Sequence, residues 1–267
     1  MIPPPAAYLK LPYNTAAKYE GKHPGSRALV ISNGHSTSHI VDKKAVLKNY
    51  FDCIIVVNRG FEFFDDVADY HVVCEKISPT SMNRLYMTLN AGNYRTDMPR
   101  FFNWKGIQHY DSRYNVHKLV RNYFDGKPNI RRYSNGTTEG LLIGYPSSNN
   151  MALGSVTLSS MHLASILGAK EIYLIGADMM FKDNSDHFYQ DRAYRDGQKQ
   201  TKAKNLNHVV SVEHRGKTYQ TTDYFRDSAT CIDKFIKDSF SKELQVFDFS
   251  DGLITAATPL DPVEFFK

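Results

Sequence analysis

The sequence predicts an α/β fold with a mostly parallel sheet and helices on both faces. Three observations carry this prediction. Short, almost unbroken apolar runs recur along the chain, as in strands that are buried on both faces of a parallel sheet. Segments whose apolar residues follow a helical repeat lie between these runs. Polar residues come directly after several of the runs, and open parallel sheets bind their ligands at those strand ends.

The first part of the chain supplies three predicted strands. Residues 27–32 (RALVIS) form the first, and a helix is predicted from Ser38 to Tyr50. The second strand is predicted over residues 53–57 (CIIVV) and the third over residues 70–74, followed by a helix at about residues 80–90. Strands and helices in this order are typical of a Rossmann-like parallel sheet.

The clearest helix–strand unit runs from Gly154 to Asp178. Small and hydroxylated residues at its start suit a helix N-terminus, and Gly168 is placed to end the helix because glycine readily adopts positive φ. Residues 172–175 then form a short apolar strand. Asp178 would lie at the carboxyl edge of the sheet, where ligands bind. An ordinary helix–strand unit with a solvated aspartate is the simpler interpretation.

The remaining segments complete a single Rossmann-like domain over residues 27–267, preceded by an irregular arm over residues 1–26. Residues 92–150 are aromatic and basic, which fits either a lid-like insertion or a packed peripheral layer. Residues 182–224 are polar and are predicted to be rich in loops. A helix is predicted from Phe225 to Phe240 and a last strand from Leu244 to Phe249.

Composition predicts a folded cytoplasmic protein. The 267 residues can bury a large core, and no run approaches the ~20 apolar residues that span a bilayer. The three scattered cysteines favour buried free thiols. The net charge of +5 is mildly basic, which suits a nucleotide, another polyanionic substrate or anionic lipid headgroups. It is too small to indicate a nucleic-acid partner.

The loop Asn33-Gly34-His35-Ser36 lies between a predicted strand and a predicted helix. Free backbone N–H groups and the helix dipole attract phosphate there. The loop lacks the further glycines of the dinucleotide fingerprint, and the chain has no Walker loop. A tight turn is the simpler interpretation of this loop alone. Because Asn58 and residues 75–76 also follow predicted strands, the three polar strand ends together favour a nucleotide cleft.

Residues 183–194 (DNSDHFYQDRAY) place His187 among carboxylates and aromatic rings. Carboxylates can hold a divalent cation, but their spacing here matches no defined site and no Asp-X-Asp triplet occurs, so no metal site is predicted. His208 and His214 follow in a polar segment. An imidazole can take a proton from a hydroxyl near neutral pH, so His208 and His214 are candidate bases. For each of them an ordinary surface role is the alternative.

Taken together, these motifs resemble the bacterial sialyltransferase-like and Kdo-transferase-like proteins that use CMP-activated sugars. Residues 32–36 (SNGHS) are similar to the loop after that family's first strand, and Asn58 in VVNRG is similar to the asparagine after its second. Residues 167–178 (LGAKEIYLIGAD) give the most specific match. Residues 244–262 (LQVFDFSDGLITAATPLDP) resemble the family's last strand and its serine-containing loop. The wider group includes proteins that modify flagellin.

The resemblance implies a GT-A-like variant of the Rossmann fold and a glycosyltransferase that needs neither metal nor cofactor. It would move an acidic sugar, of sialic acid or Kdo type, from a CMP donor to a hydroxyl of a glycan or a lipopolysaccharide. The implied partners are a nucleotide-sugar donor and a glycan or lipid-linked glycan. Contact with an anionic inner-membrane surface and a homo-oligomer are compatible with this activity.

The same resemblance assigns roles to particular residues. A histidine after the aspartate strand would be the base, for which His208, His187 and His214 compete in that order. Because Met179-Met180 replaces one expected aromatic position, Tyr189 or Tyr194 would assist the leaving phosphate. The nucleotide and the donor pocket would be bound or bordered by Asn33, Gly34, Ser36, Asn58, Gly154 and Ser155.

Two other functions remain open on the sequence. The same fold group includes archaeal hydroxymethyl-dihydropterin pyrophosphokinases, which need ATP and a metal. In that case Asp178, Asp183 and Asp186 would be the natural metal ligands. A non-catalytic module that binds a nucleotide or a sugar is the alternative from a different functional class.

Overall fold

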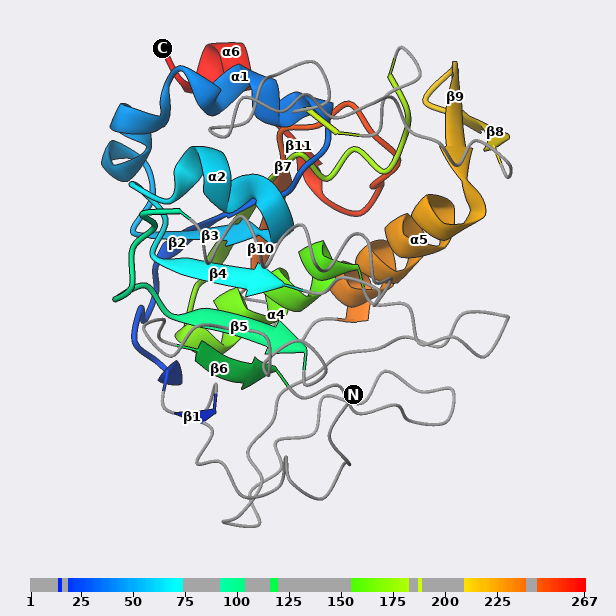
Figure 1. Ribbon diagram of the computed structural model, residues 1–267. Coiled ribbons are helices and arrows are strands. Elements are labelled where there is room, and N and C mark those ends of the chain that lie inside the picture. Colours follow the sequence, from blue (N-terminus) through cyan, green and yellow to red (C-terminus); the bar gives the residue numbers. More distant parts are fainter. Residues whose placement is uncertain are drawn as a thin grey trace, which may run out of the picture.

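The computed structural model describes residues 14–15, 19–73, 92–103, 116–119, 155–182, 187–188, 209–238 and 244–267. Within these ranges a nine-stranded sheet, in which all neighbouring strands are parallel, carries helices on both faces (Figure 1). The predicted α/β, Rossmann-like fold is therefore confirmed. No helix in the described ranges is long and apolar enough to cross a bilayer.

The sheet grows outward from a central strand, β2 (Arg27–Ile31). On one side follow β3 (Cys53–Val57), β4 (Tyr70–Val73), β5 (Arg100–Asn103), β6 (Val116–Leu119) and the short β1 (Asn14–Thr15). On the other side lie β7 (Glu171–Ile175), β10 (Gln245–Asp248) and β11 (Thr258–Pro259). The direction of growth reverses between β2 and β7, so the switch point at which such sheets bind ligands lies there.

Two apolar layers bury the two faces of the sheet. Alternate residues of β2 serve both: Ala28 and Val30 belong to one core cluster, Leu29 and Ile31 to the other. This double burial explains the unbroken apolar runs. The first layer contains α4 (Val156–Leu167) and α5 (Asp223–Asp238); the second contains α1 (Ser38–Val41), α2 (Phe61–Phe64) and α6 (Pro262–Phe265).

Helix α4 is capped at both ends. The Ser155 side chain accepts a hydrogen bond from the Leu158 N–H (3.1 Å), and Gly168 ends the helix at φ 96°. The N-terminal arm adds to the second cap, because the Gly21 N–H donates to the Ile166 carbonyl at 2.9 Å. The described part of the arm therefore packs against the domain.

Three segments differ from the sequence prediction. The helix predicted from Ser38 to Tyr50 is split into α1 and a 3-10 helix over Lys44–Asn49, because the Lys43 N–H bonds the Ile40 carbonyl and closes a tighter turn. Strands β5 and β6, which the sequence did not predict, come from the segment that fitted either a lid-like insertion or a packed peripheral layer. The segment predicted to be rich in loops contains an antiparallel hairpin of β8 (Val209–His214) and β9 (Lys217–Thr222). The helix predicted at residues 80–90 lies outside the described residues.

A buried polar network reaches the carboxyl end of β3. Arg100, which has no exposed surface, donates to Asp65 (2.8 Å) and to Nδ1 of His71 (2.9 Å). A guanidinium can only donate, so Nδ1 accepts and the proton lies on Nε2. That Nε2–H donates to the Asn58 carbonyl at 2.7 Å. Burial and the charge of Arg100 hold the pKa of His71 well below its usual value, so the ring stays neutral.

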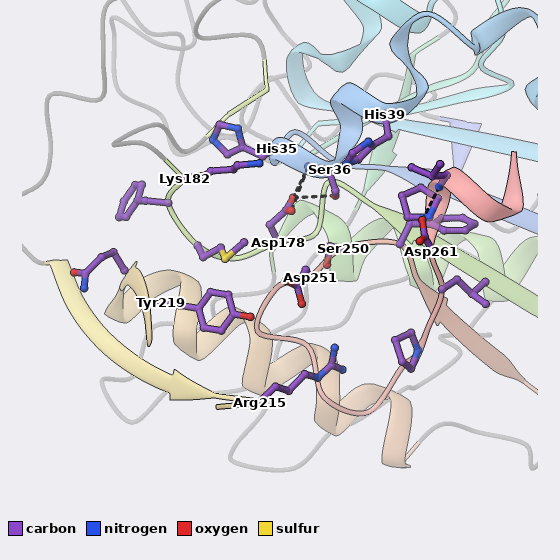
Figure 2. A pocket seen from close by; sticks show the side chains of 18 of the residues that line it. His35, Ser36, His39, Asp178, Lys182, Arg215, Tyr219, Ser250, Asp251 and Asp261 are labelled. Carbon is purple, nitrogen blue, oxygen red and sulfur yellow. Dashed lines mark hydrogen bonds between the residues drawn. The ribbon is translucent and has the colours of Figure 1, made fainter. Parts of the chain in front are cut away.

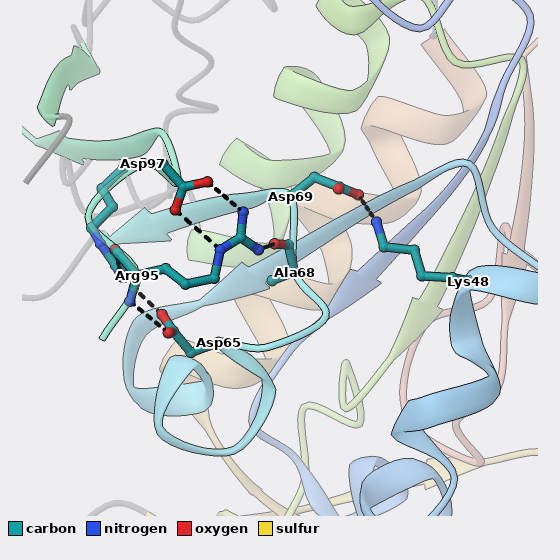
Figure 3. A network of polar contacts seen from close by, with 7 residues as sticks. Lys48, Asp65, Ala68, Asp69, Arg95 and Asp97 are labelled. Carbon is teal, nitrogen blue, oxygen red and sulfur yellow. Dashed lines mark hydrogen bonds and ion pairs between the residues drawn. The ribbon is translucent and has the colours of Figure 1, made fainter. Parts of the chain in front are cut away.

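A second arginine lies beside this network at the surface. Arg95 makes two hydrogen bonds to Asp97 through its guanidinium and one to Asp65 through its backbone N–H (Figure 3). The Asp97 side chain is 72% exposed, whereas that of Asp65 is only 6% exposed. The Arg100 guanidinium therefore binds a buried carboxylate, whereas the Arg95 guanidinium binds an exposed one.

Replacing each arginine by methionine should separate these environments. Arg100→Met leaves the Asp65 carboxylate buried without its charged partner and should lower the free energy of unfolding by about 3–5 kcal/mol. Arg95→Met removes an exposed pair and should lower it by about 1 kcal/mol. Urea denaturation of both variants measures the difference. Equal losses would contradict the structural role given to Arg100.

Candidate functional site

A cavity of about 710 Å³ lies at the carboxyl edge of the sheet, beside the switch point. The loops after β2, β7 and β10 line it, together with β9 and the start of α6 (Figure 2). Among the predicted site residues, Ser36 is part of this lining. The position agrees with the rule that ligands of open α/β sheets bind outside the carboxyl ends of the strands.

The contact between Asp178 and Ser36 joins the loop after β2 to the loop after β7. Asp178 is only 2% exposed, and its carboxylate accepts hydrogen bonds from the Ser36 N–H (3.2 Å) and hydroxyl (3.1 Å). The Ser36 oxygen in turn accepts from the Gly176 N–H at 2.8 Å. The hydroxyl proton is used in the contact with Asp178, which Figure 2 shows, and a lone pair of the same oxygen is used in the contact with Gly176, so both fix the two loops.

Glycines allow the three loops to meet backbone to backbone. A Cβ on Gly34 would lie 2.1 Å from a carboxylate oxygen of Asp178 and 2.6 Å from the Gly176 carbonyl oxygen. A Cβ on Gly252 would lie 2.1 Å from the Asp178 carbonyl oxygen. No side chain fits at either position unless the loops move apart. Gly34, predicted as a phosphate-loop residue, thus has a clear packing role.

Two buried carboxylates lie at the ends of neighbouring strands. Asp248, the last residue of β10, accepts hydrogen bonds from the Ser250 N–H (2.9 Å) and hydroxyl (2.7 Å). Burial raises the pKa of Asp248 to about 7; the charge of Asp178 adds to this, and the Ser250 hydrogen bonds oppose it. Burial also raises the pKa of Asp178, and its bonds to Ser36 oppose that shift.

The cavity lining also carries positive charge. Lys182 and Arg215 both line it, and neither forms an ion pair with a carboxylate in the described part of the chain. In contrast, Asp251 pairs with Lys217 at 2.7 Å, and Asp261 accepts the Val263 N–H at 2.7 Å. Lys182 and Arg215 therefore suit an anionic ligand, although the Asp178 carboxylate in the same lining opposes them.

Asn33 and Asn58, both predicted to bind the nucleotide, are not part of the cavity lining. Asn33 is 8% exposed; its amide N–H donates to the Val57 carbonyl (3.4 Å), and its amide oxygen has no partner among the described residues. Asn58 begins a 3-10 turn over Asn58–Gly60 in the left-handed conformation, at φ 43°. The side chain of Asn33 thus connects the ends of β2 and β3.

Ser155, predicted to border the donor pocket, caps α4 and does not line the cavity. The helix start nevertheless lies beside the end of β2, because the Ser32 and Thr157 hydroxyls are 2.7 Å apart. Gly154, its predicted neighbour, lies outside the described residues.

Of the predicted catalytic residues, only His187 is described; His208, Tyr189 and Tyr194 are not. His187 lies next to the loop after β2, because the N–H of the following Phe188 donates to the Asn33 carbonyl at 2.9 Å. The third histidine of the sequence prediction, His214, ends β8, and its ring centre lies 6.0 Å from that of Tyr219.

The sequence reasoning missed Tyr219, Lys182 and Arg215 as cavity residues. The hairpin that carries two of them had a local signal, since residues 209–222 (VVSVEHRGKTYQTT) include an Arg-Gly turn between polar and apolar residues in alternation. Arg215 and Gly216 both adopt positive φ, as a tight hairpin turn requires.

The hairpin is seated on the segment that follows Asp178. The Phe181 N–H donates to the Gln220 carbonyl at 2.8 Å, and the buried Thr221 hydroxyl donates to the Met179 carbonyl at 2.6 Å. Met179 itself is left-handed, at φ 54°. The position of Tyr219 in the cavity wall therefore depends on the same segment that fixes Ser36.

No group of three or more His, Cys, Asp or Glu side chains placed to hold a metal ion occurs within the described ranges. Neither a protein-family model nor a curated protein matches the chain. The fold and the site together define an α/β protein with a cavity beside the switch point of its sheet.

Gly34→Ala should break the contact between the first two loops. The new methyl group would overlap the Asp178 carboxylate, so we expect a loss of about 1–3 kcal/mol in the free energy of unfolding. Gly25→Ala is the comparison at an uncrowded position: nothing lies within 4 Å of an added Cβ there, but its φ of 73° adds backbone strain that Gly34, at φ −72°, does not have. That variant should lose about 1 kcal/mol from backbone strain alone. A Gly34→Ala variant as stable as the wild type would contradict the close approach.

Asp248 should make stability depend on pH. Its folded pKa of about 7 lies above the ordinary value of 3.8, so the folded state binds an extra proton between these values. The stability that this proton contributes is complete below about pH 4 and is lost as the pH rises through 7. Asp248→Asn keeps an acceptor for Ser250 but cannot ionise.

The free energy of unfolding of Asp248→Asn, relative to the wild type, should therefore rise between pH 4 and 8. The slope is at most about 1.4 kcal/mol per pH unit. Denaturation curves at several pH values measure it. A constant difference between the two proteins would show that Asp248 does not titrate in this range.

Proposed function

We propose that this protein is a glycosyltransferase that moves an acidic sugar, of sialic acid or Kdo type, from a CMP donor to a hydroxyl of a glycan or lipopolysaccharide. One observation carries the proposal. Two of the segments that resemble the CMP-sugar family, the loop at Ser36 and the strand end at Asp178, form one hydrogen-bonded unit although they lie 142 residues apart. This unit borders a cavity whose lining includes Lys182 and Arg215, two cations without an ion-pair partner among the described residues.

The chemistry of transfer fits such a cavity. The bond between the anomeric carbon and the CMP phosphate breaks, a bond to the acceptor oxygen forms, and the acceptor proton passes to a base. The phosphate gains charge as it leaves, and fixed donors and cations stabilise that charge most when they are positioned in advance. Lys182 and Arg215 supply positive charge, whereas Asp178 is a positioning residue because both its oxygens bind Ser36.

The base belongs to one of the histidines that follow the Asp178 strand. Support is strongest for His187 among the described residues, since Phe188 ties this segment to the Asn33 carbonyl at 2.9 Å. His208 and His214 remain the other candidates. A cytoplasmic position against the inner membrane, where a lipid-linked acceptor is found, fits the mildly basic net charge of +5.

Thermal unfolding with CMP and without divalent metal tests the proposal. CMP should raise the melting temperature, because a ligand at 100 times its Kd stabilises a protein by about 2.7 kcal/mol. Cytidine, which lacks the phosphate, should have a smaller effect. Lys182→Ala and Arg215→Ala should reduce the CMP shift. Lys170→Ala, the same change before β7 at the opposite edge of the sheet, should leave it intact.

Other outcomes would identify other functions. A shift with ATP only in the presence of magnesium would contradict the proposal and favour a pyrophosphokinase of the hydroxymethylpterin type. No shift with any nucleotide would favour a module that binds a sugar without catalysis. Where CMP binds, release of CMP from a CMP-activated acidic sugar measures turnover. Loss of turnover in His187→Ala or His208→Ala with CMP binding retained identifies the base.

A further inference from the structure

Tyr219 projects from β9 into the wall of the cavity. The residue is 7% exposed, and its ring packs in a small apolar cluster with Ala229 and Leu253. Figure 2 shows the ring extending from the hairpin toward the loop that carries Asp251, with Arg215 below it. The hairpin thus presents a phenol and a guanidinium to the same cavity.

The Tyr219 hydroxyl is buried and has no hydrogen-bond partner within the described residues. Buried tyrosine hydroxyls usually have one, because burial without a hydrogen bond costs stability. The neighbouring polar groups are already engaged. Ser250 donates to Asp248 at 2.7 Å, and Asp251 pairs with Lys217 at 2.7 Å. The described residues therefore leave this hydroxyl without a partner, and a bound molecule can supply one.

The charged residues around the Tyr219 hydroxyl indicate that the bound molecule has a negatively charged group. Arg215 makes one long hydrogen bond, to the Ile254 carbonyl at 3.4 Å, and no ion pair with a described carboxylate. Lys182 lines the same cavity. A phenol donates well to an oxyanion, and such hydrogen bonds are stronger than neutral ones. The Tyr219 hydroxyl and the two cations, Lys182 and Arg215, thus all favour a ligand that carries an oxyanion.

We propose that the β8–β9 hairpin forms an oxyanion subsite, in which the Tyr219 hydroxyl donates a hydrogen bond to a phosphate or carboxylate of the ligand and Arg215 supplies the charge. The inference rests on the proposed function for the identity of the ligand, since the oxyanion is the CMP phosphate or the carboxylate of the acidic sugar. It extends that function to a hairpin outside the segments that resemble the family.

Tyr219→Phe is the decisive variant, because it removes one oxygen atom that bonds nothing in the described protein. Ser228→Ala is its matched control: Ser228 lies in α5 with no exposed surface, its hydroxyl also lacks a partner among the described residues, and it does not line the cavity. Without ligand, both variants should melt at or above the wild-type temperature.

Ligand titrations separate the two variants. If CMP supplies the oxyanion, Tyr219→Phe should weaken CMP binding by about tenfold or more, and Ser228→Ala should leave it unchanged. Cytidine should bind wild type and Tyr219→Phe equally. If the sugar carboxylate is the partner, the tenfold loss should appear with the free acidic sugar and not with CMP.

Failure of the subsite and failure of the proposed function give different results. Binding of CMP and acidic sugar that Tyr219→Phe leaves unchanged overturns the subsite alone, as does a lower melting temperature of unliganded Tyr219→Phe. If wild type binds neither, inorganic phosphate is the remaining probe. If phosphate raises the melting temperature of wild type but not that of Tyr219→Phe, the subsite is supported without the transferase activity. If phosphate does not raise the melting temperature of wild type, both proposals are overturned.

Discussion

The site depends on one interaction, the hold of the buried Asp178 carboxylate on Ser36. A carboxylate removed from water is unfavourable unless hydrogen bonds replace its hydration. The Ser36 N–H and hydroxyl do so at 3.2 and 3.1 Å, and in return the loop after β2 acquires a fixed shape. Gly34 lies so close to the same carboxylate that the loop has no room for another arrangement. Sequence separation is irrelevant to this contact, since parallel strands bring their carboxyl ends to one edge.

The same contact also determines the electrostatics of the cavity. Because the Asp178 backbone meets Gly252, the loop after β10 is drawn close, and Asp248 lies near enough for the Asp178 charge to help raise its pKa to about 7. An anionic ligand would meet repulsion from these carboxylates. The unpaired Lys182 and Arg215 at the cavity wall offset that repulsion, and the proton on Asp248 reduces it further below neutral pH.

The sequence predicted the parts of the fold that local patterns determine. Strands β2, β3 and β7 are buried on both faces, and double burial leaves an unbroken apolar run that is easily seen. Strands β5 and β6 were not predicted, because they lie in an aromatic, basic segment without such runs. Ser36 was found because polar residues at strand ends converge by topology. Tyr219 and Arg215 were missed because their approach to the cavity depends on where a separate hairpin docks, which is a non-local property.

The docking of the β8–β9 hairpin connects two parts of the site, the hydrogen-bonded strand ends and the side chains that would contact the ligand. At the end of β7 Asp178 bonds Ser36 of the loop after β2, and at the end of β10 Asp248 bonds Ser250 of its own loop. These carboxylates therefore build a frame and have little left for a ligand. The hairpin, in contrast, offers a free donor to a ligand, because the Tyr219 hydroxyl has no hydrogen-bond partner among the described residues. Its seat is the segment after Asp178, through the Met179 carbonyl and the Phe181 N–H. The backbone that holds Ser36 on one side therefore sets the position of the hairpin on the other, and a shift of Asp178 would move both walls of the cavity together.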